Sequence, residues 1–225
     1  MDIGKFLIND PKQFIQLEKS MDNHTLQFYA ENSANLAEKY NSCSGGISAY
    51  FAEAFSPGMK ILDIGCGSGR DLCELRKMGY DAYGVDACKE FVDLVNENLC
   101  SSVVSLATLP ELANIVDKSY DGILCSAVLM HLPEEELFDA AFSIRRIMRE
   151  KGRLLLSIPL NDPTIDPKTK RDSGGRLFNG VTSEQLQLLF ERIGFKLINR
   201  WESDDSLNRE HRKWATMLFE LEAKK

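Results

Sequence analysis

The sequence lacks the residue groupings that most metal-binding and disulfide-bonded proteins use. Its 225 residues include six cysteines, but no two form a C-x-x-C pair, and the three histidines are scattered. A zinc site is therefore not expected. Most of the cysteines lie inside apolar runs, as reduced thiols of a protein core do, and this favours a cytoplasmic location.

Long hydrophobic segments and an excess of positive charge are also missing. No stretch approaches the length of a membrane span, and the first residues lack the apolar core and cleavage site of a signal peptide. The net charge of -7 would repel a phosphate backbone. The densest basic cluster, residues 145–153, is interpreted as a solvated helix end. We expect neither a membrane nor a nucleic-acid partner, and the oligomeric state stays open.

The hydrophobic pattern changes at Pro57-Gly58. Before this break the apolar residues recur at helical spacing, between Asn23 and Tyr40 and again from Ile47 to Phe55. After it, apolar strand-like runs alternate with helical stretches, which predicts a parallel sheet covered on both faces. The expected strands are Lys60–Ile64, Ala82–Val85, Val103–Leu106, Gly122–Ser126 and Arg153–Ile158, and the expected helices are Arg70–Met78, Lys89–Leu99 and Pro133–Arg149.

The last third of the chain begins with a polar segment, Asn161 to Gly180, that is long for a structureless loop and predicts either a functional loop or disorder. Thr182 and Gln185 then form a plausible capping box for a helix that ends at Gly194. The final strands, Phe195–Trp201 and Trp214–Leu221, have no helix between them, so we expect an antiparallel pair. We predict one domain, residues 1–225, with a helical cap (1–56) and an α/β core (57–225).

The segment from Asp63 to Gly69, which reads D-I-G-C-G-S-G, carries the clearest chemical signal. Glycines between a strand and a helix allow a tight turn and a close approach of ligand to the backbone, and the helix N-terminus offers free N–H groups. A dinucleotide-binding turn would have a third glycine where this chain has Arg70, which disfavours an NAD-dependent oxidoreductase. A carboxylate at Asp63 suits an ammonium group instead. Asp86, which ends the next strand, suits the hydroxyls of a ribose, with a helix N-cap as the alternative.

Taken in order, these motifs resemble those of the class I S-adenosylmethionine-dependent methyltransferases of the small, stand-alone type. The resemblance runs from about Thr25 to the C-terminus and includes the glycine motif, Asp86, the fourth-strand motif 120–133 and the helix–turn–strand segment 146–157. It implies a Rossmann-like three-layer sandwich: a mostly parallel seven-stranded sheet with an antiparallel final hairpin and an N-terminal helical cap. It also implies S-adenosyl-L-methionine as cofactor and S-adenosyl-L-homocysteine as product.

The resemblance also implies a set of cofactor-binding positions. Tyr29 and Tyr40 match a helix that closes over the cofactor in such enzymes, although rim tyrosines of an amphipathic helix would look the same. The family often has an acidic residue near the adenine, whereas Val104 to Pro110 contains none, so backbone groups and apolar contacts would hold the adenine. The predicted set is Tyr29, Tyr40, Asp63, Gly65, Cys66, Gly67, Arg70, Asp86, Ala87, Ala107, Thr108, Cys125, Ser126 and Ala127.

The sequence gives less information about the methyl acceptor than about the cofactor. His131 is a candidate general base because its pKa lies near neutrality, but it also fits a packing role at the start of a helix. Arg176 lies between glycines and an aromatic residue and is a candidate for binding an anionic acceptor group. We expect in-line methyl transfer to a small molecule, with catalysis mainly by positioning. The alternatives are a non-catalytic S-adenosylmethionine-binding module and a protein or tRNA methyltransferase.

Overall fold

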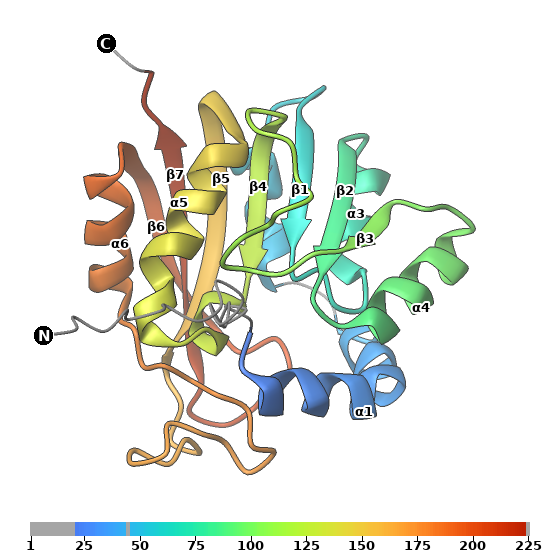
Figure 1. Ribbon diagram of the computed structural model, residues 1–225, viewed down its shortest axis with the longest axis vertical. Helices are drawn as coiled ribbons and strands as arrows, with labels where there is room; N and C mark the ends of the chain where they lie inside the picture. The colour runs from blue at the N-terminus through green and yellow to red at the C-terminus, as the bar shows by residue number, and fades with distance from the viewer. Residues whose placement is uncertain (1–20, 44–45, 224–225) are drawn as a thin grey trace, which may run out of the picture.

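The computed structural model describes residues 21–43 and 46–223 and contains a seven-stranded sheet in the order β3-β2-β1-β4-β5-β7-β6. The first twenty residues, part of the predicted cap, lie outside the described residues. Strands β1 to β5 are parallel, and β7 runs antiparallel to both β5 and β6 (Figure 1). The strands are β1 (Lys60–Ile64), β2 (Asp81–Asp86), β3 (Val104–Leu106), β4 (Tyr120–Ser126), β5 (Met148–Asn161), β6 (Phe195–Asp204) and β7 (Lys213–Leu221).

Helices cover both faces of this sheet, which confirms the predicted Rossmann-like sandwich (Figure 1). Helices α5 and α6 pack on one face, and α2, α3 and α4 pack on the other. The α-helices are α1 (Asn23–Asn41), α2 (Phe51–Ala54), α3 (Arg70–Lys77), α4 (Lys89–Leu99), α5 (Leu137–Ile147) and α6 (Ser183–Arg192); the 3-10 turns are η1 (Gly46–Tyr50), η2 (Leu129–His131) and η3 (Glu134–Glu136). Thr182 and Gln185 form the predicted capping box of α6.

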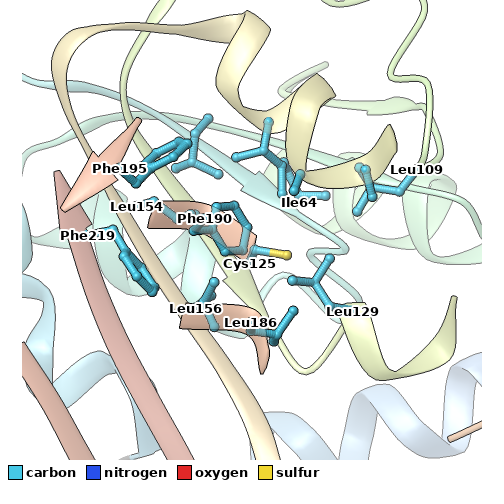
Figure 2. Packing of buried hydrophobic residues seen from close by; sticks show 14 of the residues in the cluster. Ile64, Leu109, Cys125, Leu129, Leu154, Leu156, Leu186, Phe190, Phe195 and Phe219 are labelled. Carbon is cyan, nitrogen blue, oxygen red and sulfur yellow. The ribbon is translucent and has the colours of Figure 1, made fainter. Parts of the chain in front are cut away.

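Two buried hydrophobic layers hold the sandwich together because successive side chains of a strand point to opposite faces. Leu154 and Leu156 of β5 face the α5–α6 side, whereas Leu155 between them faces α2 and α3. Figure 2 shows the first layer, where Phe190 of α6 packs against residues of the sheet, among them Phe219 of β7. Its ring centroid lies 5.4 Å from that of Phe219. Burial on both faces explains why these strands appear as continuous apolar runs in the sequence.

The predicted helix Pro133–Arg149 is wrong at both ends. Pro133 has an extended backbone (ψ 143°), a 3-10 turn follows, and the α-helix begins only at Leu137. At the other end the chain leaves the helix after Ile147, and Met148 pairs with Tyr120 as the first residue of β5. The basic cluster therefore lies partly in a strand. Its cations have partners and are not simply solvated: Arg149, for example, is ion-paired with Asp121 (2.8 Å), and Arg145 donates to the Ile193 carbonyl.

The predicted helical cap divides into two parts with different positions. Helix α1 lies beyond the carboxyl ends of the parallel strands, at the bottom of Figure 1, next to the loop that follows β5. In contrast, Ile47, Phe51 and Phe55 are buried in the core layer beside α3. Helix α1 thus lies over the strand ends, where open α/β sheets bind their ligands, and Gly46 and Ile47 at the start of η1 line the cavity found there.

The long polar loop after β5 is ordered by local contacts. Isolated β-bridges join Asp166 to Arg171 and Arg171 to Leu177. Arg171 also holds α1, because its guanidinium donates to both carboxylate oxygens of Asp22, the N-cap of that helix, at 2.7 and 2.8 Å. The loop and α1 thus form one continuous cover. No helix within the described ranges has the length and hydropathy needed to cross a membrane.

Candidate functional site

The glycine turn follows β1 and reaches toward the neighbouring strand. The N–H groups of Gly65 and Cys66 donate to the Val85 carbonyl at 2.8 and 3.1 Å, and this pins the turn to β2. Gly65 has φ +70°, and a Cβ at this position would clash with Cγ2 of Val128. Glycine is therefore required at position 65 for two reasons: the positive φ of the backbone, and the close approach of Val128 in the segment after β4.

The Asp86 carboxylate accepts hydrogen bonds from the backbone of the glycine turn and of the segment after β2. Its Oδ2 accepts from the Gly67 N–H and its Oδ1 from the Cys88 N–H, both at 2.8 Å. The N-cap of α4 is Cys88, so the alternative interpretation of Asp86 as the helix cap is wrong. Burial raises the pKa of Asp86, and the backbone N–H bonds oppose that shift. Each carboxylate oxygen keeps a second acceptor position for a ligand hydroxyl.

Asp63 lies beneath the turn and is almost fully buried, with 2% of its surface exposed. Its Oδ2 has no hydrogen-bond partner among the described residues. Burial raises the pKa of Asp63 well above its usual value, and the nearby carboxylates of Asp71 and Asp86 add to the shift. Arg70 donates twice to Asp71 at 3.0 Å, so that arginine is already neutralised. The turn therefore carries an excess of negative charge, which suits a cationic ligand.

One cavity joins most of the predicted residues at the carboxyl ends of β1, β2 and β4. Asp63 and Cys125 do not line it: the Asp63 carboxylate is buried, and the Cys125 side chain points into the core (Figure 2). Ala127, just beyond β4, has φ +59°, a strained conformation typical of binding sites. The predicted residues that line the cavity are Tyr29, Tyr40, Gly65, Cys66, Gly67, Arg70, Asp86, Ala87, Ala107, Thr108, Ser126, Ala127, His131 and Arg176.

The predicted adenine end offers few free polar groups. The Ala107 N–H donates to the Asp86 carbonyl at 3.1 Å, and the Thr108 carbonyl accepts from Leu112 N–H at 2.9 Å. The Thr108 hydroxyl donates to the Leu109 carbonyl at 2.8 Å. These backbone groups are engaged within the protein. Apolar contact with Ala107 and Leu109 is therefore the main interaction that this end provides.

A polar cluster around His131 also lines the cavity. The His131 ring lies between two residues of the cover, with Nδ1 2.6 Å from the Leu177 carbonyl and Nε2 3.0 Å from the Tyr29 hydroxyl. A carbonyl only accepts, so Nδ1 carries the proton, and Nε2 accepts from the Tyr29 O–H. Burial lowers the pKa of His131 to about 4, and the Arg176 charge contributes. The imidazole is neutral at pH 7.

Arg176 is committed to contacts within the protein. Its Nε and Nη2 donate to Asp172 at 2.9 and 2.5 Å, and Nη1 donates to the Tyr29 hydroxyl at 3.3 Å. The guanidinium also lies 4.7 Å from the Phe28 ring centroid. The prediction that Arg176 binds an anionic acceptor has less support than expected, because its Nε, Nη1 and Nη2 atoms all donate to partners within the protein.

Sequence reasoning missed several residues that line the cavity. Asp71 follows Arg70 in the first turn of α3, where its sequence position was a usable signal. Arg212, just before β7, was not singled out, whereas Trp214 and Thr216, at the start of β7, were read only as strand residues. Their alternate spacing places them on one face of the strand, and this pattern was visible in the sequence.

These features fit S-adenosylmethionine: a buried carboxylate lacking a partner, a glycine turn that a Cβ would obstruct, and Asp86 at the ribose position. The fold and the site define a class I S-adenosylmethionine-dependent methyltransferase. A family model described as a methyltransferase domain matches residues 36–200, and the chain belongs to that family. Its cofactor is S-adenosylmethionine.

Individual relatives are more distant. The chain is 29% identical over 133 residues to a probable S-adenosyl-L-methionine-dependent methyltransferase TehB of Haemophilus influenzae, covering 57% of this chain and 46% of that protein. It is 23% identical over 220 residues to an arsenite methyltransferase of Halobacterium salinarum, covering 91% and 54%. The chain spans about half the length of these curated relatives.

A solved structure confirms the fold. The Burkholderia thailandensis 1,6-didemethyltoxoflavin-N1-methyltransferase, with bound 1,6-didemethyltoxoflavin and S-adenosylhomocysteine, superposes with a TM-score of 0.71. The match covers 89% of this chain and 88% of that one, at 16% sequence identity. At this identity the similarity establishes the architecture alone.

Proposed function

We propose that the protein transfers the methyl group of S-adenosylmethionine to a small-molecule acceptor by in-line displacement. The observation that carries this proposal is one cavity, among the described residues, that is lined both by the glycine turn with Asp86 and by His131 and Trp214. The glycine turn and Asp86 are the residues expected to bind the cofactor, and residues of α1 and of the loop after β5 complete the lining. The relative named for arsenite supports a small-molecule acceptor.

The cofactor supplies a methyl group that the sulfonium has already activated. The residues of this chain then need to align the acceptor and exclude water, which are effects of positioning. Asp86 and the turn hold the ribose side, and the buried acidic groups near Asp63 favour the cationic ligand. The cover excludes water, because Leu177 N–H donates to the Thr25 hydroxyl at 2.8 Å and fastens the loop to α1.

The geometry limits how His131 acts as a base. Its one unprotonated nitrogen accepts from Tyr29 O–H, so a proton taken from an acceptor would reach His131 through that hydroxyl. The Tyr29 oxygen would accept the proton of the acceptor while its own proton moves to Nε2. With a pKa of about 4, His131 is a weak base at neutral pH. We therefore assign it mainly the positioning of Tyr29, and we assign Arg176 the positioning of the aromatic residues around it.

We further propose that the whole chain acts as one domain in the cytoplasm and that its acceptor is not nucleic acid. The negative net charge and the enclosed acceptor end both support this proposal. A macromolecular substrate would need an open groove at the strand ends, which α1 and the loop cover (Figure 1).

The test is a calorimetric titration with S-adenosylmethionine, S-adenosylhomocysteine and NAD. We expect micromolar binding of the first two and none of NAD. Asp86→Asn should weaken cofactor binding by about tenfold or more, because a hydrogen bond to a charged group contributes roughly 1.5–3 kcal/mol. Methyl transfer from labelled S-adenosylmethionine to small molecules would then establish turnover. Binding of NAD alone would refute the proposal, and cofactor binding without transfer to any acceptor would favour a non-catalytic binding module.

A further inference from the structure

We propose that Arg212 binds a carboxylate group of the methyl acceptor and that the acceptors of this protein are therefore small monoanionic acids. This inference rests on the proposed methyltransferase function, because it concerns the acceptor end of the same cavity. It depends on the position of Arg212, on its one internal partner, and on the pairing of the other cavity arginines.

Arg212 is a cation held inside the cavity wall. Its side chain is only 7% exposed, yet the residue lines the cavity. Within the described part of the chain its guanidinium has one hydrogen-bond partner, from Nη2 to Oδ2 of Asp162. The other carboxylate oxygen of Asp162 is engaged by the N–H and hydroxyl of Thr164, at 3.1 and 2.6 Å. The guanidinium thus keeps Nε and Nη1 donors for a ligand.

The other arginines of the cavity are more fully paired. Arg70 donates twice to Asp71, Arg176 twice to Asp172, and Arg209 twice to Asp205. Arg70 and Arg209 thereby make the two parallel bonds that a carboxylate offers, and Arg176 donates twice to one oxygen of Asp172 and once more to the Tyr29 hydroxyl. Arg212 alone among these four has a single bond to its carboxylate, so it has the greatest remaining capacity for an anion. Burial lowers its pKa, which an incoming anion would counteract.

The surrounding residues hold Arg212 in place and connect it to the cofactor end. Trp214 and Thr216 lie on one face at the start of β7, Arg212 immediately precedes that strand, and all three residues line the cavity. Trp214 is fixed by its Nε1–H bond to Asp205 at 2.8 Å. Thr216 pairs in register with Ser157, whose hydroxyl lies 3.1 Å from that of Ser126. A row of side chains therefore leads from the end of β4 to the guanidinium.

A carboxylate fits this site better than a phosphate does. The guanidinium fork binds either group, but a phosphate monoester carries nearly two negative charges at neutral pH. Asp162 already offsets much of the single positive charge of Arg212, so little remains to balance a second negative charge on the ligand. One additional negative charge is closer to what the pocket tolerates than two. Phe178 and Trp214 in the lining suit a planar body attached to the acid.

The experiment measures carboxylate recognition separately from cofactor binding. The full-length protein is first titrated with S-adenosylhomocysteine, and the saturated complex is then titrated by NMR with 4-hydroxybenzoate, 4-hydroxybenzamide and 4-hydroxyphenyl phosphate. The first two probes differ mainly in charge. We expect the benzoate to bind at least about tenfold more tightly than the amide, in line with hydrogen bonds to a charged group.

Two substitutions with opposite expected effects exclude a merely structural role. Arg212→Gln should bring the affinity ratio of benzoate to benzamide close to one. Asp162→Asn should increase that ratio, because it removes the charge that competes for the guanidinium. Loss of folding alone would not move the two variants in opposite directions. Arg192→Gln, an exposed arginine at the end of α6, is the matched control and should leave the ratio unchanged.

The outcomes separate this inference from the function on which it rests. Failure to bind S-adenosylhomocysteine would overturn the proposed function and the inference with it. Binding of S-adenosylhomocysteine with no preference for the benzoate, or with an equal preference in Arg212→Gln, would overturn only the inference. Tighter binding of the phosphate than of the benzoate would also overturn it, since the assignment is to a monoanionic acid.

Discussion

Asp63 should contribute to cofactor binding at a cost to the stability of the free protein. Its carboxylate is 2% exposed, Oδ2 has no partner in the described structure, and its pKa is raised by burial and by two neighbouring acids. A buried charge without a partner destabilises the folded state. The cationic cofactor would offset this cost when it binds, so the substitution Asp63→Asn should affect stability and affinity in opposite directions.

The expected magnitudes follow from the loss of one buried charge. Relieving an unsatisfied buried group is worth about 1–3 kcal/mol, and each kcal/mol raises Tm by roughly 2–4 °C in a protein of this size. Affinity for S-adenosylmethionine should fall by about tenfold or more, the value of an interaction with a charged group. Calorimetric scans of the free protein and titrations with the cofactor measure the two effects.

The pH dependence supplies a further check on Asp63. Because its pKa is raised in the folded state, the folded protein binds the proton more tightly than the unfolded chain does. Stability from this group is complete below its unfolded pKa of 3.8 and is lost as the pH rises through the raised value. Asp63→Asn should remove that loss. The control is Asp93→Asn, a 54% exposed surface partner of Lys89, which should change neither quantity appreciably. A Tm and an affinity for Asp63→Asn equal to those of the wild type would refute the reasoning.

The turn and His131 lead to two further predictions. Gly65→Ala should lose cofactor binding, and it should lose more stability than the control Gly79→Ala. A Cβ at position 65 meets Val128, whereas Gly79 has a similar φ (+88°) but open space around it. Urea unfolding measures both losses, and equal losses of about 1–2 kcal/mol in the two variants would contradict this prediction. The pKa of His131 is about 4 in the folded protein and 6.5 in the unfolded chain, and this difference contributes about 3 kcal/mol to the free energy of unfolding. The contribution is complete above pH 6.5 and is lost as the pH falls toward 4. His131→Asn should therefore flatten the dependence of unfolding free energy on pH between those values, and an unchanged slope would rule out the assigned neutral state.

The sequence by itself determined the order of the elements and the place of the glycine turn. Both depend on local signals: apolar runs of strand length, and glycines at Gly65, Gly67 and Gly69 that all take positive φ. The capping box at Thr182 is likewise a local signal, since its two hydrogen bonds join residues three positions apart. Such features need no knowledge of the rest of the chain, so their predictions were confirmed.

The tertiary structure decided what each side chain faces. Strands buried on both sides show no alternation, so the sequence did not reveal that Cys125 points into the core and away from the cavity. The end of α5 was misplaced because the pairing of Met148 with Tyr120, a contact between distant residues, overrides local helix propensity.

The charge state of the acceptor end depends on contacts between residues even farther apart in the sequence. His131 is held by Tyr29, 102 positions away, and by Leu177, 46 positions away. Arg212 has its carboxylate partner 50 positions away. The identity of a residue limits which charges it can carry, but burial and partners determine which charge it has. Only the fold brings those partners together.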